Sequence, residues 1–229
     1  MKYKNVREGI FVERPNRFVA KVIVDGVEET VHVKTSGRCE ELLLEGCTVL
    51  LEESDNEKRK TKYDLIGVYK DGFGLINIDG QVPGKLFREW LELDNGFFPP
   101  IEYLNEEFEY ENGDFDYYFE QGERKIFIEV RGVNIERLGT GYFPEGPTAK
   151  EAEVVEQLCV ANKEGYECYM VFIIPMRGVE IVMPNKEVDR IYRDAMVKAI
   201  REGVKYLFFA CNVSENEITL SHAKLIDHL

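Results

Sequence analysis

Two acidic residues and one arginine carry the clearest chemistry in this sequence. Asp116 lies in the extended segment GDFDYYF and Glu129 in the extended segment IFIEVRG, so a turn between them would let the two carboxylates meet across a strand pair. Glu129 and Arg131 are two residues apart, so in a strand both side chains project from the same face. Carboxylates bind Mg²⁺ or Mn²⁺, and such ions activate water and neutralise the charge that develops in phosphodiester hydrolysis. These residue types therefore predict a phosphodiesterase site in which Asp116, Glu129 and Arg131 are catalytic and the two acids are metal ligands.

A solvated hairpin is the simpler interpretation of the same alternating charges. The setting of Glu129 favours a site, because it lies between Ile128 and Val130 in an apolar strand. An unpaired carboxylate is costly to bury in such a place. Both interpretations remain open at the level of spacing alone.

The elements of the first part of the chain predict a small barrel. Residues 18–35 alternate β-branched and polar side chains on both sides of Asp25-Gly26, which is typical of a tight hairpin. Three further short strands are expected at residues 47–52, 63–69 and 75–78. About five short strands in about 80 residues indicate a barrel of the oligonucleotide-binding (OB) type, crossed by one short helix at residues 38–44.

The second part of the chain predicts an α/β domain. A helical period starts near residue 83, and we place the domain boundary there, giving domains of residues 1–84 and 85–229. The expected order is helix, strand, strand, helix, strand, helix, strand, at residues 83–93, 114–120, 125–130, 148–163, 168–175, 186–201 and 204–213. Thr148 and Glu151 would form a capping box at the start of the second helix. This order implies a mixed sheet covered on both faces, and the fold class is α+β with two domains.

The charge of the chain is unevenly distributed. Residues 1–85 hold 14 basic and 15 acidic side chains, whereas residues 86–229 hold 15 and 28, and the whole chain has a net charge of −14. The nearly neutral first half can carry a basic face, while the acidic second half either repels phosphate or gathers metal ions.

The cysteines and the apolar segments indicate a cytoplasmic protein. The five cysteines are odd in number and form no C-x-x-C pair, which argues against both a disulfide framework and a zinc ribbon. No signal peptide is recognisable at the start, and no segment approaches the length of a membrane span, so we expect no membrane partner.

Basic residues of the first domain are candidate contacts for nucleic-acid phosphates. Taken singly, each is more simply a solvated surface charge, but grouped on a barrel edge they favour nucleic-acid binding. The candidates are Arg14, Arg17, Arg38, Lys58, Arg59, Lys60 and Lys62.

Seven ordered segments give the sequence a family resemblance. They are residues 13–18 (ERPNRF), 32–38 (HVKTSGR), 59–65 (RKTKYDL), 113–116 (GDFD), 127–133 (FIEVRGV), 143–148 (FPEGPT) and 183–185 (MPN). In this order the chain resembles the sugar fermentation stimulation protein A family over nearly its whole length.

The resemblance implies an OB-like barrel followed by a domain similar to the restriction-endonuclease-like PD-(D/E)xK superfamily. It also implies DNA binding and a nuclease linked to sugar, notably maltose, metabolism. Asp116 then matches the motif aspartate and Glu129 the acidic member of E-x-K, while Glu89 is matched to a further acidic metal ligand, with a surface carboxylate as the simpler reading. Arg131 stands where the motif has lysine, and arginine cannot act as a base, although it can clamp a phosphate oxygen.

Two functions follow as expectations. The first is a nucleic-acid-binding protein, with DNA favoured over RNA, that has a Mg²⁺- or Mn²⁺-dependent nuclease site. The alternative is a non-catalytic DNA-binding regulator of sugar metabolism that retains the nuclease scaffold. A homodimer is an open possibility, and a sugar-binding enzyme is suggested by the family name alone.

Overall fold

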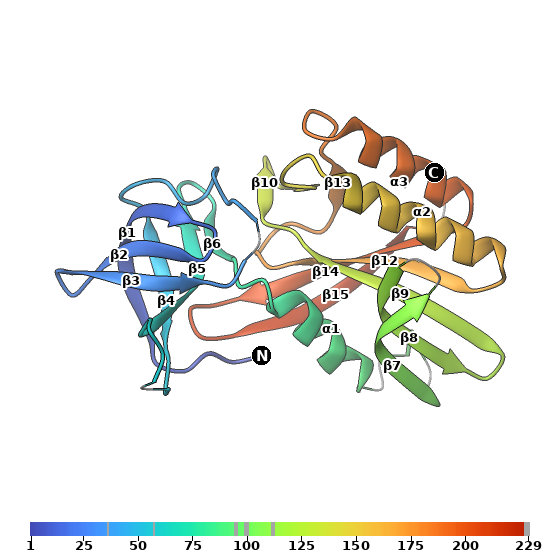
Figure 1. The fold of residues 1–229 in the computed structure, drawn as a ribbon, viewed down its shortest axis with the longest axis horizontal. Helices are drawn as coiled ribbons and strands as arrows, with labels where there is room; N and C mark the ends of the chain where they lie inside the picture. The colour runs from blue at the N-terminus through green and yellow to red at the C-terminus, as the bar shows by residue number, and fades with distance from the viewer. Residues whose placement is uncertain (36, 57, 94–95, 99–100, 111–112, 227–229) are drawn as a thin grey trace.

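The chain folds into a barrel followed by a larger α/β domain (Figure 1). The structure is a computed structural model, and it describes residues 1–35, 37–56, 58–93, 96–98, 101–110 and 113–226. No helix in these described ranges combines the length and the apolar character that a bilayer crossing requires. The predicted boundary at residue 84 falls in the first turn of the helix that follows the barrel.

The first domain is built from six strands. They are β1 (Val6–Asn16), β2 (Val19–Val24), β3 (Val27–Val33), β4 (Thr48–Glu53), β5 (Tyr63–Lys70) and β6 (Gly74–Asn77). Their order is β3-β2-β1-β4-β5-β6, and a parallel pairing of β3 with β5 closes the first five into a barrel. Asp25 and Gly26 both have positive φ at the turn between β2 and β3, as the Asp-Gly pair predicts. The barrel prediction is confirmed, and β1 is the strand that it missed.

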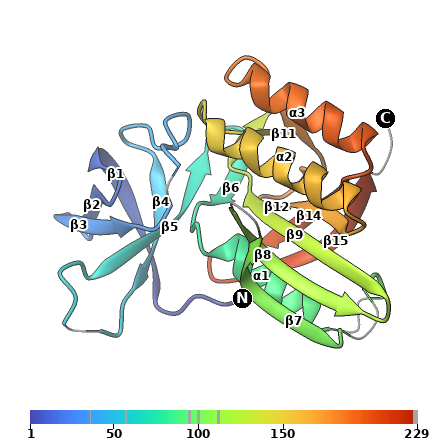
Figure 2. The same cartoon turned by 45° about the vertical axis from the view of Figure 1, so that its right-hand side comes forward.

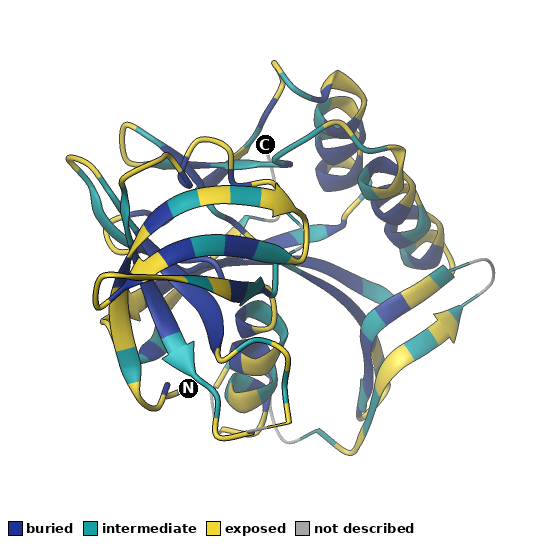
Figure 3. Ribbon diagram, turned by 60° about the vertical axis from the view of Figure 1, so that its left-hand side comes forward, coloured by how far each residue is buried: buried dark blue, intermediate teal, exposed yellow. Residues whose placement is uncertain are grey.

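Buried residues alternate with more exposed ones along barrel strands such as β2 (Figure 3). Ala20, Val22 and Val24 point inward from β2, and their neighbours in the sequence face solvent or are half-buried. The predicted helix at residues 38–44 is wrong, because that segment forms turns. Cys39 has a φ of 54°, which a right-handed helix cannot contain, and its backbone N–H donates to Glu145 of the second domain.

The second domain has a six-stranded mixed sheet between helices. Its elements are α1 (Val82–Leu91), β7 (Tyr103–Tyr110), β8 (Gly113–Gln121), β9 (Arg124–Gly132), β10 (Ile135–Arg137), β11 (Thr140–Phe143), α2 (Ala149–Lys163), β12 (Glu167–Ile174), β13 (Val182–Pro184), α3 (Arg190–Arg201), β14 (Lys205–Val213) and β15 (Ile218–Ile226). The sheet order is β15-β14-β12-β9-β8-β7, with β9, β12 and β14 parallel to one another. A small sheet of β10, β11 and β13 lies beside it.

Helices cover both faces of this sheet, as predicted (Figure 2). Alternate residues of one strand separate the two cores: Phe127 belongs to the core that includes α2 and α3, whereas Ile126 and Ile128 belong to the core that includes α1. Because side chains alternate along a strand, Glu129 and Arg131 lie on the α2 face with Phe127. The pleat of β9 therefore determines that the candidate site lies on the face of the sheet that α2 covers.

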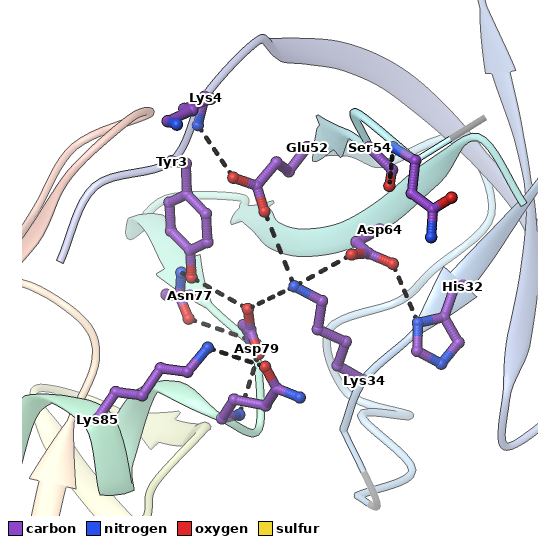
Figure 4. Close-up of polar contacts among 12 residues, drawn as sticks. Tyr3, Lys4, His32, Lys34, Glu52, Ser54, Asp64, Asn77, Asp79 and Lys85 are labelled. Atoms are coloured by element: carbon purple, nitrogen blue, oxygen red, sulfur yellow. Dashed lines mark hydrogen bonds and ion pairs between the residues drawn. The ribbon is translucent and has the colours of Figure 1, made fainter. Parts of the chain in front are cut away.

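A polar network joins the barrel to the start of α1 (Figure 4). The Lys34 ammonium lies 3.1 Å from the Asp79 carboxylate and 3.2 Å from that of Asp64. Asp64 also accepts hydrogen bonds from Arg59 and contacts His32. Burial acts to raise the pKa of Asp64, but these hydrogen bonds and cations outweigh it and lower the pKa to about 2.

Replacing Asp64 with asparagine should destabilise the protein at neutral pH. Because the folded-state pKa of Asp64 is depressed from 3.8 to about 2, its contribution is present above about pH 4 and is lost as the pH falls towards 2. We expect Asp64→Asn to lower the free energy of unfolding by about 2 kcal/mol at pH 7 in urea titrations, and by much less at pH 2.5. The control is Asp71→Asn at an exposed turn, and equal losses in both variants at pH 7 would contradict the role of Asp64.

Candidate functional site

Asp116, Glu129 and Arg131 converge at the end of the β8–β9 pair. The Arg131 Nη1 donates to Glu129 Oε2 at 2.7 Å and lies 3.4 Å from Asp116 Oδ2. The backbone N–H of Val130 donates to the same Asp116 oxygen at 2.7 Å, which fixes that carboxylate against β9. The strand pairing that places Tyr117 opposite Ile128 brings the two acids to neighbouring positions. The three residues singled out by their spacing thus share one cluster.

A fourth charged residue, Glu151, completes the cluster from α2. Its Oε2 accepts from the Arg131 Nε at 2.8 Å, so the guanidinium contacts carboxylates of β8, β9 and α2. The predicted capping box is wrong: Thr148 is the N-cap residue of α2, but its side chain makes no capping hydrogen bond. Glu151 is turned towards the guanidinium instead, since a charged partner binds a carboxylate more strongly than a backbone N–H does.

Glu129 is the most buried member of this cluster. Only 3 % of its surface is exposed, whereas the side chain of Asp116 is 43 % exposed. The pKa of Glu129 is raised to about 8: burial is the main cause, Arg131 acts against it, and the neighbouring Asp116 adds to the rise. The pKa of Arg131 is also raised: burial opposes the charged form, but the surrounding carboxylates outweigh it. Arg131 is therefore a permanent cation, and Glu129 is a carboxyl group for which the effect of burial exceeds that of the neighbouring cation.

The net charge of the cluster suits the binding of a divalent cation. Three carboxylates face one guanidinium, so the fully ionised cluster has two excess negative charges, which is the charge that one divalent ion balances. Carboxylate oxygens are also the donors that Mg²⁺ and Mn²⁺ prefer. Across the part of the chain that the structure describes, no three His, Cys, Asp or Glu side chains are already arranged around a metal position. The guanidinium of Arg131 takes the central place among these acids. The donors therefore fit a divalent ion in kind and in charge, but binding it requires that Arg131 give up part of its pairing.

Asp116, Arg131 and Glu151 line a cleft of about 740 Å³ between the two domains, whereas the buried Glu129 is not part of its lining. The barrel contributes Thr35, Gly37 and Arg38 to its lining, and the second domain contributes the start of α1, the end of β9 and the loop before α2. Acidic residues outnumber basic ones in the lining, which contains six acids and two arginines: Asp79, Glu106, Glu107, Asp116, Glu145 and Glu151, with Arg38 and Arg131. Such a lining attracts cations more readily than phosphate.

Glu89 is not brought to this cluster. It lies on the exposed face of α1, where its carboxylate pairs with the Met1 amino group at 3.2 Å, and it does not line the cleft. Glu151 is the third acid there instead. The signal that could have identified it is its place one turn into the helix that follows the segment FPEGPT.

The basic residues of the barrel differ in whether protein oxygens already bind their side chains. Arg14 donates to four backbone carbonyl oxygens, including those of Gly37 and Arg38, and so holds the loop after β3. Arg59 is bound to Asp64, and Lys62 pairs with Glu53 at 3.2 Å.

The remaining four basic residues are exposed. Arg17 lies over the ring of Phe18, and Arg38, with 82 % of its side chain exposed, reaches Glu40 at 3.4 Å. For Lys58 and Lys60 the structure records no carboxylate partner within the described ranges. Of the candidate phosphate contacts, only Arg38 lines the cleft.

Comparison with known proteins identifies the family. The model of the sugar fermentation stimulation protein RE domain matches residues 81–217, and that of the SfsA N-terminal OB domain matches residues 12–78. The chain belongs to the sugar fermentation stimulation protein family.

Relatives and a solved structure agree with this membership over the full length. A sugar fermentation stimulation protein homolog of Desulfitobacterium hafniense is 50 % identical over 218 residues, covering 95 % of this chain and 94 % of the relative. A homolog of Ruminiclostridium cellulolyticum is 46 % identical over 220 residues, covering 96 % of each chain. The solved structure of Pyrococcus furiosus SfsA in complex with Ca²⁺ has the same fold, with a TM-score of 0.84 at 22 % identity over 97 % of this chain and 96 % of that one.

The raised pKa of Glu129 predicts a pH-dependent stability in this family member. Between pH 4.5 and about 8 the folded state keeps a proton that the unfolded state has lost, so without divalent ions stability should fall by up to about 1.4 kcal/mol per pH unit. Glu129→Gln removes this dependence. The variant should be more stable than the parent at pH 7.5, and the difference should shrink towards pH 4.5, as measured by urea unfolding in EDTA.

Glu153→Gln is the matched control, since Glu153 is an exposed acid on α2 close in sequence to Glu151. A Glu129→Gln variant that is less stable than the parent at pH 7.5 would show that Arg131 fully neutralises this carboxylate.

Proposed function

We propose that this protein binds nucleic acid, with DNA favoured over RNA, and hydrolyses phosphodiester bonds in its cleft with the help of Mg²⁺ or Mn²⁺. The observation that carries the proposal is the cluster of Asp116, Glu129 and Glu151 around Arg131, in which Asp116, Glu151 and Arg131 line the cleft. An acidic pair on adjacent strands can hold a divalent ion that activates water, and a nearby cation can stabilise the charge that develops on the phosphate in phosphodiester hydrolysis.

Asp116 and Glu129 are the residues that would hold the metal ion, with Glu151 beside them. A bound ion of this kind would polarise the phosphate and lower the pKa of an attacking water. The related fold of Pyrococcus furiosus SfsA is described in complex with Ca²⁺, which supports a divalent-cation site in this chain. Glu89 has no part in this proposal, because it is paired elsewhere on α1.

The residues of the chain have separate tasks in this proposal. Arg131 stays charged at every accessible pH, so it serves as a phosphate clamp and holds the carboxylates in place. Glu129, with a pKa of about 8, holds a proton at its carboxylate until a further positive charge arrives. Asp116, fixed by the Val130 N–H, lines the cleft.

The barrel supplies the contacts that lie outside the cleft. Arg17, Arg38, Lys58 and Lys60 are exposed and lie on its loops, where they can pair with phosphates. Arg14, Arg59 and Lys62 act on the protein itself, because each is held by protein oxygens. The free thiols of all five cysteines agree with a reducing cytoplasm as the place of action.

A binding protein without cleavage is the second candidate, and the position of Arg131 favours it. Its guanidinium already contacts three carboxylates, so a metal ion must displace part of this pairing. In that case the protein would be a DNA-binding regulator linked to sugar metabolism that keeps the scaffold of a nuclease.

Cleavage assays distinguish these two functions. Purified protein incubated with end-labelled DNA and RNA oligonucleotides in Mn²⁺ or Mg²⁺ should cut them, and EDTA should abolish the cutting. Asp116→Asn should reduce the rate by about 100-fold or more, because it removes a metal ligand, whereas Glu153→Gln should not. Salt-sensitive binding without cleavage would support the regulator, and cleavage unchanged in Asp116→Asn would contradict the site.

The dependence of binding on salt measures the phosphate contacts. Four exposed basic residues predict a shallow slope in log Kobs against log [salt], about −2.8 for a single strand and about −3.6 for a duplex. The double variant Lys58→Gln/Lys60→Gln should reduce the steepness by about half, since each lysine contributes about 0.7 to 0.9. Lys125→Gln, an exposed lysine of the second domain, is the control. An unchanged slope in the double variant would show that the loop carrying Lys58 and Lys60 does not contact nucleic acid.

A further inference from the structure

The joint between the two domains is fixed by bonds on several sides of the cleft. The backbone N–H of Asn77, at the end of β6, donates to the Pro175 carbonyl at 2.9 Å, and Tyr3 donates in the same way to Asn216 at 2.8 Å. Ile76 forms an antiparallel bridge with Met176. These are backbone contacts between the barrel region and the sheet of the second domain, so a rotation of the barrel would break them together.

Side chains tie the same joint from the buried side (Figure 4). The Asp79 side chain is fully buried, and it accepts from Lys34 at 3.1 Å and from the backbone N–H of Gln81 at 3.0 Å. Tyr3 donates to Asp79 at 3.4 Å and accepts from Asn77 at 2.8 Å. One carboxylate therefore connects the end of β3 and the N-terminal segment to the first turn of α1.

The loop after β3 is tied to the second domain as well. The backbone N–H of Cys39 donates to Glu145, and Arg137 pairs with Glu41 at 2.6 Å. Gly37 packs so closely on Glu145 that a side chain at that position would collide with its carboxylate. Because Gly37 and Glu145 both line the cleft, these contacts fix its width.

A cleft of fixed width limits the nucleic acid that can reach the acidic cluster. Its volume of about 740 Å³ is that of a small-molecule site, which suffices for one or two nucleotides. A double helix is wider than its own major groove, which is about 12 Å across and 8.5 Å deep. A space that holds one or two nucleotides therefore cannot enclose a duplex. The cluster lies on the cleft wall, so a phosphate must enter the cleft to meet Asp116 and Arg131.

We propose that the site takes unpaired strands, either single-stranded nucleic acid or the unpaired segments of a partly double-stranded one. This inference rests on the proposed function. An unpaired strand can turn its bases away from the backbone and bring one phosphate into the cleft. Phe143 and the rings of Pro83 and Pro144 line the walls, and they offer apolar surfaces to unstacked bases.

Substrates of one sequence in three forms test this proposal. The wild-type protein with Mn²⁺ receives a labelled single strand, the blunt duplex of that strand, and the duplex with a long overhang. We expect the single strand to be cut at least 10-fold faster than the blunt duplex, with cuts in the third substrate confined to the overhang. A blunt duplex cut as fast as the single strand overturns the inference and leaves the proposed function standing.

Binding decides the matter if no substrate is cut, an outcome that counts against the proposed function alone. Asp116→Asn with the same three substrates in Ca²⁺ should bind the single strand at least 10-fold more tightly than the blunt duplex. Equal affinity for the two forms overturns the inference.

A cross-link tests the fixed joint directly. Glu41→Cys/Arg137→Cys, joined by a short bis-maleimide, locks the loop to the second domain at a point where the native side chains already touch. The locked protein should process the single strand at an unchanged rate, and wild-type protein treated with the reagent controls for native thiols. Loss of single-strand cleavage on locking would show that the joint opens, and it would overturn the inference.

Discussion

The guanidinium of Arg131 is the constraint on which the candidate site depends. It pairs with Asp116 of β8, Glu129 of β9 and Glu151 of α2. Arg131 is the member of the cluster that contacts all of the other three. Arg131 also acts on the buried Glu129, because its positive charge opposes the rise in pKa that burial causes. The same cluster keeps an excess of negative charge, so it is held together while remaining able to accept a further cation.

The mixed sheet explains why these residues can meet. Parallel pairing of β9 with β12 places the carboxyl end of β9 at the edge of the sheet where α2 begins, so a residue in the first turn of α2 faces Arg131. The antiparallel pairing with β8 adds Asp116 from the other side. The barrel then closes this edge and converts an open sheet end into a cleft, which links the two domains in one site.

Much of this arrangement follows from local patterns in the sequence. Period-two spacing places Glu129 and Arg131 on one face, and the strand, turn, strand pattern puts Asp116 beside them; the structure has all three together. The barrel, both long helices and the buried strands are recognisable because their apolar residues follow the period of a strand or a helix. These features need only neighbouring residues for their prediction.

What the sequence did not reveal depends on contacts between distant residues. Glu151 fits a capping motif equally well, and only its distance from Arg131 decides between the two roles. The segment 38–44 has helical composition, but its carbonyl and N–H groups are bound by Arg14 and Glu145. The edge strands β7 and β15 have too many exposed polar residues to show an apolar period, and their pairing partners stabilise them. The sequence predicts that Glu89 lies on a helix, but it does not show that this helix packs on the face of the sheet opposite to the cluster.

A crystal soaked in Mn²⁺ tests the central claim most directly, because Mn²⁺ gives an anomalous signal that locates the ion without reference to activity. We expect a peak in contact with carboxylate oxygens of Asp116 and Glu129, with the Arg131 guanidinium displaced from at least one of them. An unchanged Arg131 cluster with no peak beside it, at Mn²⁺ concentrations that occupy other sites, would show that this cluster is not a metal site.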